Sequence, residues 1–302
     1  MSRISRFAFA AVGCVFASLS LAQITLTPAG TFASGVFDES ATEIAAFDPA
    51  SDKLFVVNAD TDSITVLSVS NTSVTSFFDS IDLSTYGAPN SVAVKNGLVA
   101  VACASDPATD PGTVVFMDTN GTVINTLTVG ALPDMLIFSP NGKYLLVANE
   151  GEPNDDYNVD PEGSISVIDM TGNPANLSQA DVSTAGFGAF NVASLDPSIR
   201  IFGPGATVAQ DLEPEYITIS KDSKTAWVAC QENNALAVVD IKSATVTGLV
   251  GLGFKNHRRY WNSLDTSDKD GTINLRRWPI WGLCQPDAID SYQYRGQTFI
   301  IS

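Results

Sequence analysis

The chain has 302 residues, and its 33 Asp and Glu against 16 Lys and Arg give a formal net charge of −17. Such an acidic chain is a poor partner for nucleic acids and anionic membrane surfaces, and it favours cations, basic surfaces and mineral-forming ions. The single histidine, His257, excludes sites that need several imidazoles, including multi-histidine zinc or copper centres and c-type haem. The sequence contains no Gly-rich phosphate-binding loop, which would point to a nucleotide cofactor. It also contains no Gly-x-Ser-x-Gly motif, which would point to a serine hydrolase.

The first 22 residues have the order of features typical of a secretory signal peptide. Two arginines precede an uncharged apolar run, which ends at Ala22 in the small residues of a cleavage site. A membrane anchor is the alternative, although the run is short for a spanning helix. We therefore predict an extracytoplasmic protein (secreted, periplasmic or on the cell surface) with no transmembrane span, in which residues 23–302 form one domain.

One strand pattern returns five times along this domain. Each copy has an acidic or amide residue, a short apolar strand, a turn, a second apolar strand and a small polar residue. The copies begin at Glu43, Asn90, Asp134, Glu215 and Asp287, and the first four continue into a third apolar strand. Evenly spaced triplets of short strands predict an all-β fold, a β-propeller of four-stranded blades, about five of them visible.

The spacing of the copies predicts where loops are inserted. The first starts are 47 and 44 residues apart (43 to 90 to 134), which is the length of one four-stranded blade. The next intervals are 81 and 72 residues (134 to 215 to 287), so we expect inserted loops near 150–162, 175–210 and 251–283. Such loops usually gather on one face. The fifth copy stops after its second strand, and we expect the domain to be incomplete at its C-terminus.

Several stretches carry a resemblance to a known family. The most specific is NEGEPNDDYNVDPEGSISVID at 149–169, and the others are 35–59, 212–241 and 263–290. These stretches resemble the choice-of-anchor I proteins, secreted propellers related to the mesenchyme-specific cell-surface glycoprotein, and the middle strands resemble YVTN-type repeats. The resemblance implies a seven- or eight-bladed propeller on an extracytoplasmic surface, in a family whose members are often labelled alkaline phosphatase-like. Family members continue past the position of Ser302.

Four of the five residues that open the copies are acidic, and we expect them to ring one mouth of the central channel. They are Glu43, Asp134, Glu215 and Asp287, with Asn90 in the remaining copy. Carboxylates held close together raise each other's pKa and favour a bound cation. The alternative, which we favour, is that each carboxylate accepts backbone hydrogen bonds and ties one blade to the next.

The segment after Asn149 is the densest acidic loop of the chain. Its carboxylates are Glu150, Glu152, Asp155, Asp156, Asp160 and Glu162. Hard oxygen ligands in a flexible loop suit calcium, and a solvated acidic loop is the equal alternative.

A second acidic segment, Asp265, Asp268 and Asp270 before Gly271, is similar to an EF-hand loop but fails its pattern. It predicts either a different calcium site or, more simply, a turn. Beside it lies the basic cluster of His257, Arg258 and Arg259, with Lys255, Arg276 and Arg277. This cluster is a candidate for contacting an anion such as phosphate, and it could equally offset the neighbouring acids.

The pattern as a whole favours a binding or surface-interaction module over an enzyme. We expect calcium as its ligand, with no haem and no nucleotide cofactor, and cations or extracellular and cell-wall ligands as its partners. One alternative is a metal-dependent alkaline phosphatase-like phosphoesterase that would use carboxylate-bound metal in the central funnel. A purely structural envelope protein is the other, since a propeller fold hosts enzymes and scaffolds alike.

Overall fold

The computed structural model describes residues 25, 30–37, 40–70 and 73–302. The predicted signal peptide, residues 1–22, lies outside this part of the chain. Helical segments here are single turns, namely α1 (Val208–Asp211) and 3-10 turns at Ala59–Thr61, Pro174–Asn176, Gln179–Asp181, Gly188–Phe190 and Tyr260–Asn262. Within the described residues no helix is long and apolar enough to cross a membrane.

Four antiparallel sheets of four strands each follow one another along the chain. The first contains β1 (Ala45–Asp48), β2 (Lys53–Asn58), β3 (Ser63–Ser70) and β4 (Ser73–Asp82), and the second contains β5 (Ala88–Lys95), β6 (Leu98–Ala104), β7 (Pro111–Asp118) and β8 (Val123–Ala131). The third contains β9 (Pro133–Phe138), β10 (Tyr144–Asn149), β11 (Ser164–Asp169) and β12 (Val182–Gly186), and the fourth contains β13 (Tyr216–Ile219), β14 (Thr225–Cys230), β15 (Ala235–Asp240) and β16 (Thr245–Gly251). Two-stranded pairs complete the fold: β17 (Lys255–Asn256) with β18 (Trp281–Gly282), and β19 (Asp290–Tyr294) with β20 (Gln297–Ile301).

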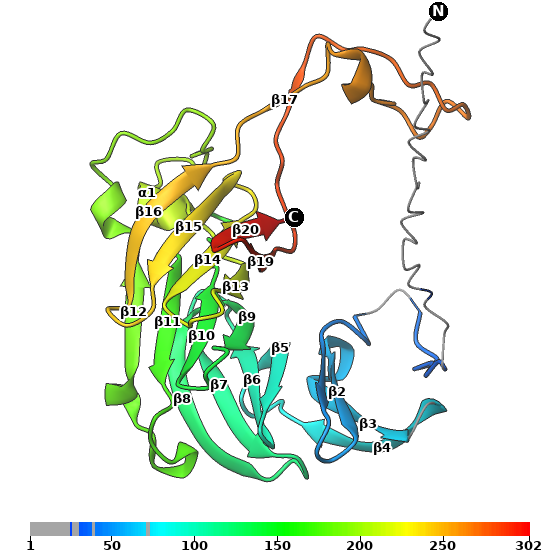
Figure 1. Ribbon diagram of the computed structural model, residues 1–302, viewed down its shortest axis with the longest axis vertical. Coiled ribbons are helices and arrows are strands. Elements are labelled where there is room, and N and C mark those ends of the chain that lie inside the picture. Colours follow the sequence, from blue (N-terminus) through cyan, green and yellow to red (C-terminus); the bar gives the residue numbers. More distant parts are fainter. Residues whose placement is uncertain (1–24, 26–29, 38–39, 71–72) are drawn as a thin grey trace, which may run out of the picture.

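The four sheets are blades of a β-propeller, which confirms the predicted fold class. In every blade the strands pair in chain order, and the first strands β1, β5, β9, β13 and β19 contact one another in succession. The blades therefore run along an arc with the first strands side by side on the inner side (Figure 1).

Apolar side chains from facing sheets fill the space between neighbouring blades. Phe55 lies in the cluster between blades one and two, Phe116 in the cluster between blades two and three, and Phe187 in the cluster between blades three and four. Cys103 and Cys230 are also buried in these clusters as free thiols. Burial raises the pKa of Cys103 to about 12 and also raises the pKa of Cys230, so both thiols stay protonated and are poor metal ligands.

The turn between the first two strands explains the different lengths of the copies. In blades three and four a four-residue turn closes with Ser139 N donating to Tyr144 O and Ser220 N donating to Thr225 O, both at 2.8 Å. In blade two the turn is only Asn96-Gly97, with φ of 52° and 79°. Both residues tolerate the positive φ of a primed two-residue turn, so this copy is two residues shorter.

A two-residue turn also changes the alignment of the fifth copy. Its turn is Arg295-Gly296, again with two residues at positive φ. Asn90 lies six residues before its turn, whereas Asp287 lies eight residues before the turn of β19 and β20. Asp287 is therefore two residues ahead of the position that the repeat assigns to it.

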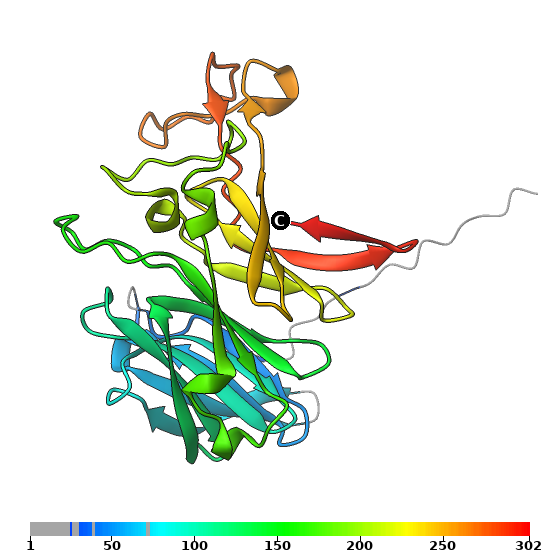
Figure 2. The ribbon, with the colours of Figure 1, turned by 90° about the vertical axis from the view of Figure 1, so that its left-hand side faces the viewer.

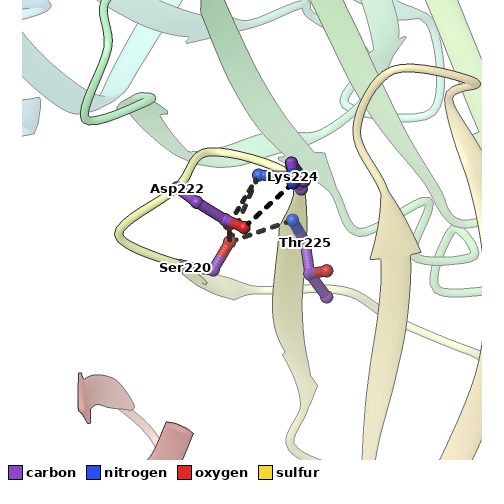
Figure 3. A network of polar contacts seen from close by, with 4 residues as sticks. All are labelled: Ser220, Asp222, Lys224 and Thr225. Atoms are coloured by element: carbon purple, nitrogen blue, oxygen red, sulfur yellow. Dashed lines mark hydrogen bonds and ion pairs between the residues drawn. The ribbon is translucent and has the colours of Figure 1, made fainter. Parts of the chain in front are cut away.

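Side chains also fix the four-residue turn of blade four (Figure 3). Ser220 Oγ donates to Asp222 Oδ1 at 2.8 Å and accepts from the backbone N–H of Thr225 at 3.0 Å. Lys224 Nζ lies 3.6 Å from Asp222 Oδ2, which is the one ion pair in the described part of the chain. Because both side chains are exposed, this pair contributes little to stability, and the hydroxyl-centred bonds shape the turn.

The long loops leave the blades at the same end, which we call the loop end. Asn149 pairs with Ser164, which pairs with Gly186, so the loops 150–163 and 187–207 begin side by side. Cys230 pairs with Ala235, which pairs with Gly251, so the segment 252–283 leaves from the corresponding end of blade four. Part of the segment that we expected to be an inserted loop, 182–186, instead forms β12, because it completes the third sheet beside β11.

Candidate functional site

Carboxylates from four chain segments meet at the loop end of blades three and four. They come from the starts of the inner strands, from the segment just before one of them, and from the first three residues after the second strands. The group consists of Asp134 near the start of β9, Glu150 and Glu152 after β10, Glu213 and Glu215 before β13, and Glu232 after β14. Antiparallel blade geometry brings these positions together, since the start of each first strand lies beside the end of the second.

Burial and mutual repulsion shift the pKa values of these carboxyls upward. Burial, followed by repulsion from neighbouring carboxylates, raises the pKa of Glu150 to about 9 and that of Glu213 to about 8. The same causes raise the pKa of Asp134 to about 6. At neutral pH the cluster therefore holds protons, because a full set of ionised carboxylates is unfavourable in this desolvated space.

Glu215 and Glu232 form a hydrogen-bonded carboxyl pair within the group. Burial raises the pKa of Glu215, and the hydrogen bond to Glu232 together with its charge raises it further. The backbone N–H of Gln231 donates to Glu215 Oε1 at 3.2 Å, and this hydrogen bond lowers the pKa of Glu215. Glu215 consequently tends to keep its proton, and a cation that binds here must displace it.

Several of these side chains open into a cavity of about 400 Å³, which we call the carboxylate cavity. Its lining includes Glu152, Asp155, Asp160, Asp211, Glu213 and Glu232, together with Tyr157 and Phe202, and it contains no Lys, Arg or His. The Oδ1 atom of Asp160 is buried and has no hydrogen-bond donor among the described residues. A buried acceptor without a donor is unusual and calls for a partner such as water or an ion.

A pair of buried polar residues holds one wall of the cavity in place. The Asp211 carboxylate accepts hydrogen bonds from the backbone N–H groups of Phe202, at 2.8 Å, and Gly203. Asn233 donates to the carbonyl of Arg200 at 3.1 Å and accepts from the backbone N–H of Glu213 at 3.0 Å. These contacts give Asp211 and Asn233 a structural role, and they position Glu213 at the wall.

The expected channel ring is only partly assembled. Glu43 and Asp287 lie close enough to Asp134 to raise its pKa, whereas Glu215 lies with Glu150 and Glu232 instead. In blade two, Asn90 Nδ2 donates to the carbonyl of Pro133 at 3.1 Å and so ties one blade to the next. This contact ties two blades through an amide donor, whereas the alternative to the cation ring had carboxylates accepting backbone N–H groups.

The predicted acidic loop divides into two parts. Glu150, Glu152, Asp155 and Asp160 face the cluster or line the cavity, and of these Glu152 and Asp155 are also exposed to solvent. Asp156 and Glu162 are exposed and lie outside the cavity lining. Asn154 organises the tip, with its Oδ1 accepting from the backbone N–H groups of Asn158 at 3.0 Å and Val159 at 3.1 Å. An amide therefore shapes the loop, which leaves its carboxylates without a turn-forming role.

The second acidic segment has the contacts of ordinary turns. Asp265 accepts from the backbone N–H groups of Ser267 at 3.2 Å and Asn274 at 2.8 Å, which lowers the pKa of its carboxyl. Asp270 accepts from the backbone N–H of Thr272 at 3.0 Å, and Asp268 is exposed. This geometry favours the turn over a calcium site in this segment.

The candidate anion contacts separate into one buried and two exposed residues. His257 is buried, and its Nδ1 lies 2.7 Å from the carbonyl of Asn262, while Arg258 and Arg259 are exposed. Among the residues that the structure describes, no three His, Cys, Asp or Glu side chains are arranged to hold a metal ion as they stand. A cation in the carboxylate cavity would therefore need its carboxylates to turn toward it.

Sequence reasoning missed Glu213, Glu232 and Asp211. Glu232 stands two residues after the end of β14, near the position that Glu150 has after β10, and this was the available signal. Nothing in the local pattern of Glu213 or Asp211 distinguishes them from surface acids, since their burial depends on the loop 187–207.

Comparisons with known proteins place this geometry in context. No curated protein matches the sequence. A functionally unknown protein from Desulfotomaculum acetoxidans has 14% identity over 68% of this chain and 56% of its own, with a TM-score of 0.48. The Cps50 (Swd1) β-propeller domain of Myceliophteria thermophila has 9% identity over 66% of this chain and 56% of its own, with a TM-score of 0.45. KlHsv2 with loop 6CD replaced has 10% identity, covers 88% of this chain and 63% of its own, and has a TM-score of 0.48.

The chain spans about half the length of the first two of these structures, and at such identities the likeness concerns the fold alone. The family comparison is more specific, because the model of the choice-of-anchor I domain matches residues 43–302. That range begins at the first repeat residue, Glu43, and includes all four blades and the carboxylate cavity. The chain belongs to the choice-of-anchor I domain family.

Proposed function

We propose that this chain is the propeller of a secreted or cell-surface interaction module, and that its carboxylate cavity binds calcium. The observation that carries the proposal is the cavity itself, where six carboxylates line about 400 Å³ with no basic side chain among the lining residues. Calcium is bound in proteins by carboxylate and carbonyl oxygens in flexible loops, and it tolerates irregular ligand geometry. The donor set of this cavity fits that preference.

A bound dication would relieve the repulsion that the raised pKa values record. Protons hold that place in the free protein, and calcium has to displace them from groups such as Glu213, whose pKa is about 8. Calcium affinity is therefore expected to rise as the pH rises, since fewer protons compete. The Asp160 oxygen that lacks a donor is the most directly available first ligand.

The test is thermal unfolding of the chain with calcium and with chelator. At calcium 100 times above its dissociation constant, preferential binding to the folded state contributes roughly 2.7 kcal/mol. For a domain of this size such a gain raises Tm by about 5 °C. We expect this rise in the wild type and its loss in Asp160→Asn, which removes one carboxylate oxygen without changing the size of the side chain.

Asp156→Asn is the matched control, because Asp156 is an exposed acid of the same loop outside the cavity lining. This variant should keep the calcium response of the wild type. Equal Tm values in calcium and chelator would refute the proposal, and equal loss of the response in both variants would assign it to general surface charge.

The phosphoesterase alternative receives less support from the same cavity. Its lining offers no Ser, Thr or Cys nucleophile and no Arg or Lys to contact a phosphate. We therefore place ion binding in an interaction module ahead of phosphate chemistry. Hydrolysis of an aryl phosphate that chelator abolishes and Asp160→Asn removes would reverse that order.

A further inference from the structure

Residues 254–282 form a projection at the loop end of blade four, which we call the basic lobe (Figures 1 and 2). Asn234, which is buried, fixes both of its roots. Its Nδ2 donates to the carbonyls of Gly253 at 2.9 Å and Ser198 at 3.0 Å, and its Oδ1 accepts from the backbone N–H of Cys284 at 2.7 Å. The lobe is therefore clamped at its base while its body stands away from the blades.

Inside the lobe, His257 is the organising residue. Its Nδ1 lies 2.7 Å from the carbonyl of Asn262, and its backbone pairs with Ile280 at 3.2 Å and Trp278 at 3.0 Å. It is the one side chain of the lobe that the structure buries among the residues described. The histidine thus holds the lobe in shape, and the remaining side chains are left for its surface.

The surface of the lobe combines large apolar side chains with basic residues, which outnumber its three acids, Asp265, Asp268 and Asp270. Tyr260 is 80% exposed, Trp261 is 73% exposed and Ile273 is 90% exposed. The lobe also exposes basic residues, among them Lys255, Arg258, Arg259, Arg276 and Arg277. None of these basic groups has a carboxylate within 4.0 Å in the described part of the chain. Tryptophan, tyrosine and arginine are the residue types that dominate binding energy at protein interfaces.

A second surface at the loop end has the complementary character. We define the acidic face by the exposed residues Glu152, Asp155, Asp156, Tyr157 and Val159 of the loop 150–163, with Ile201 and Phe202 beside them. It carries the charge opposite to that of the lobe, and it also exposes large apolar side chains. Both surfaces lie at the loop end, because the loop 150–163 follows β10 and the lobe follows β16.

We propose that the basic lobe of one molecule docks on the acidic face of a second copy. Since both surfaces share one end of the propeller, two copies related by a twofold axis can face each other and make the contact twice. Reciprocal contacts of this kind give a closed dimer. The inference goes beyond the proposed function and needs no bound calcium.

Apolar character favours a second copy over other anionic occupants. The net charge of −17 repels a second copy at long range as it repels nucleic acids, acidic polymers and anionic membranes, so the choice depends on the short-range contacts. The exposed Ile273 and Leu275 of the lobe need an apolar counterpart, which the acidic face supplies in Tyr157, Val159 and Phe202. A flexible polyanion offers charge without that apolar surface.

The experiment is sedimentation equilibrium of the chain over a range of concentration and salt. We expect a concentration-dependent species of twice the monomer mass at 50 mM salt that dissociates near 1 M, where the screening length falls to about 3 Å. The variants Arg258→Glu/Arg259→Glu and Asp155→Arg/Asp156→Arg should each weaken dimerisation by at least about tenfold. An equimolar mixture of the two variants should dimerise again, because each then presents a surface complementary to the other.

Lys221→Glu/Lys224→Glu is the control for the lobe variant, because it makes the same change in net charge at the turn between β13 and β14, at the opposite end of blade four from the loop end. It should dimerise like the wild type. A monomer under all conditions, a dimer that survives the lobe substitutions, or an unrestored mixture would overturn the proposal. A monomer that binds immobilised heparin through Arg258 and Arg259 would also overturn it and make a polyanion the occupant.

Discussion

Replacing Glu213 with glutamine should stabilise the protein at alkaline pH in the absence of calcium. Glu213 is only 8% exposed, and its pKa rises from 4.5 to about 8 through burial and the charge of neighbouring carboxylates. Below pH 4.5 both the folded and the unfolded forms hold the proton, so ionisation has no effect on stability. Between pH 4.5 and about 8 the unfolded form ionises first, and the free energy of unfolding falls.

The size of this fall follows from the shift. At about 1.4 kcal/mol per pKa unit, it reaches roughly 5 kcal/mol above pH 8. Water at the mouth of the carboxylate cavity screens part of the repulsion, which leaves roughly 2 kcal/mol for the gain on Glu213→Gln. Glutamine keeps the shape of the side chain and never ionises, and the backbone N–H of residue 213 still donates to Asn233.

The assay is urea unfolding followed by tryptophan fluorescence at pH 4.5 and pH 9, in chelator. We expect Glu213→Gln to be more stable than the wild type by roughly 2 kcal/mol at pH 9 and equal to it at pH 4.5. Glu162→Gln, at an exposed acid of the same loop end, should change neither value. An equal effect of Glu213→Gln at both pH values, or no gain at pH 9, would refute the account of a strained carboxylate cluster.

The remaining predictions concern the cavity wall and the thiols. Gly163→Ala should destabilise the fold by at least about 2 kcal/mol in urea unfolding, because a Cβ there collides with a backbone carbonyl ahead of β13; an unchanged midpoint would contradict that packing. Asn233→Ala should cost roughly 2–3 kcal/mol, and crosslinking or proteolysis should show the loop 187–207 opening, since the wall loses its buried hydrogen bonds. A thiol reagent should modify exposed Cys284 in the native protein and leave Cys103 and Cys230 unmodified until unfolding.

The propeller could be predicted from the sequence because its information is local and repeated. Strands such as those ending at Asn58 and Asn149 can be recognised by a preceding turn, a run of apolar residues and a final small polar residue. The strands of each blade then pair in chain order. The exact alignment of copies could not be predicted as well. Asp287 shares the residue type of the other starting positions, but a two-residue turn in place of a four-residue turn moves it out of register.

The candidate site was predictable where it follows the repeat or the dense acidic loop. Asp134 stands at a repeat position and Glu150 opens the acidic loop, and the structure brings both into the carboxylate cluster. Glu213 and Asp211 join it because the loop 187–207 folds over the end of blade four, and such long-range burial leaves no local mark. The predicted role of His257 as an anion contact required an exposed side chain, and the structure instead buries His257 inside the basic lobe.

Isothermal titration of calcium into the chain, in buffers of different ionisation heat, tests the central claim most directly. The account predicts that calcium binds the carboxylate cavity and releases protons on binding, with an affinity that rises as the pH passes about 8, where Glu213 of the cavity lining loses its proton. Binding without proton release would move the ion to the exposed acids, and no binding at any pH would contradict the account.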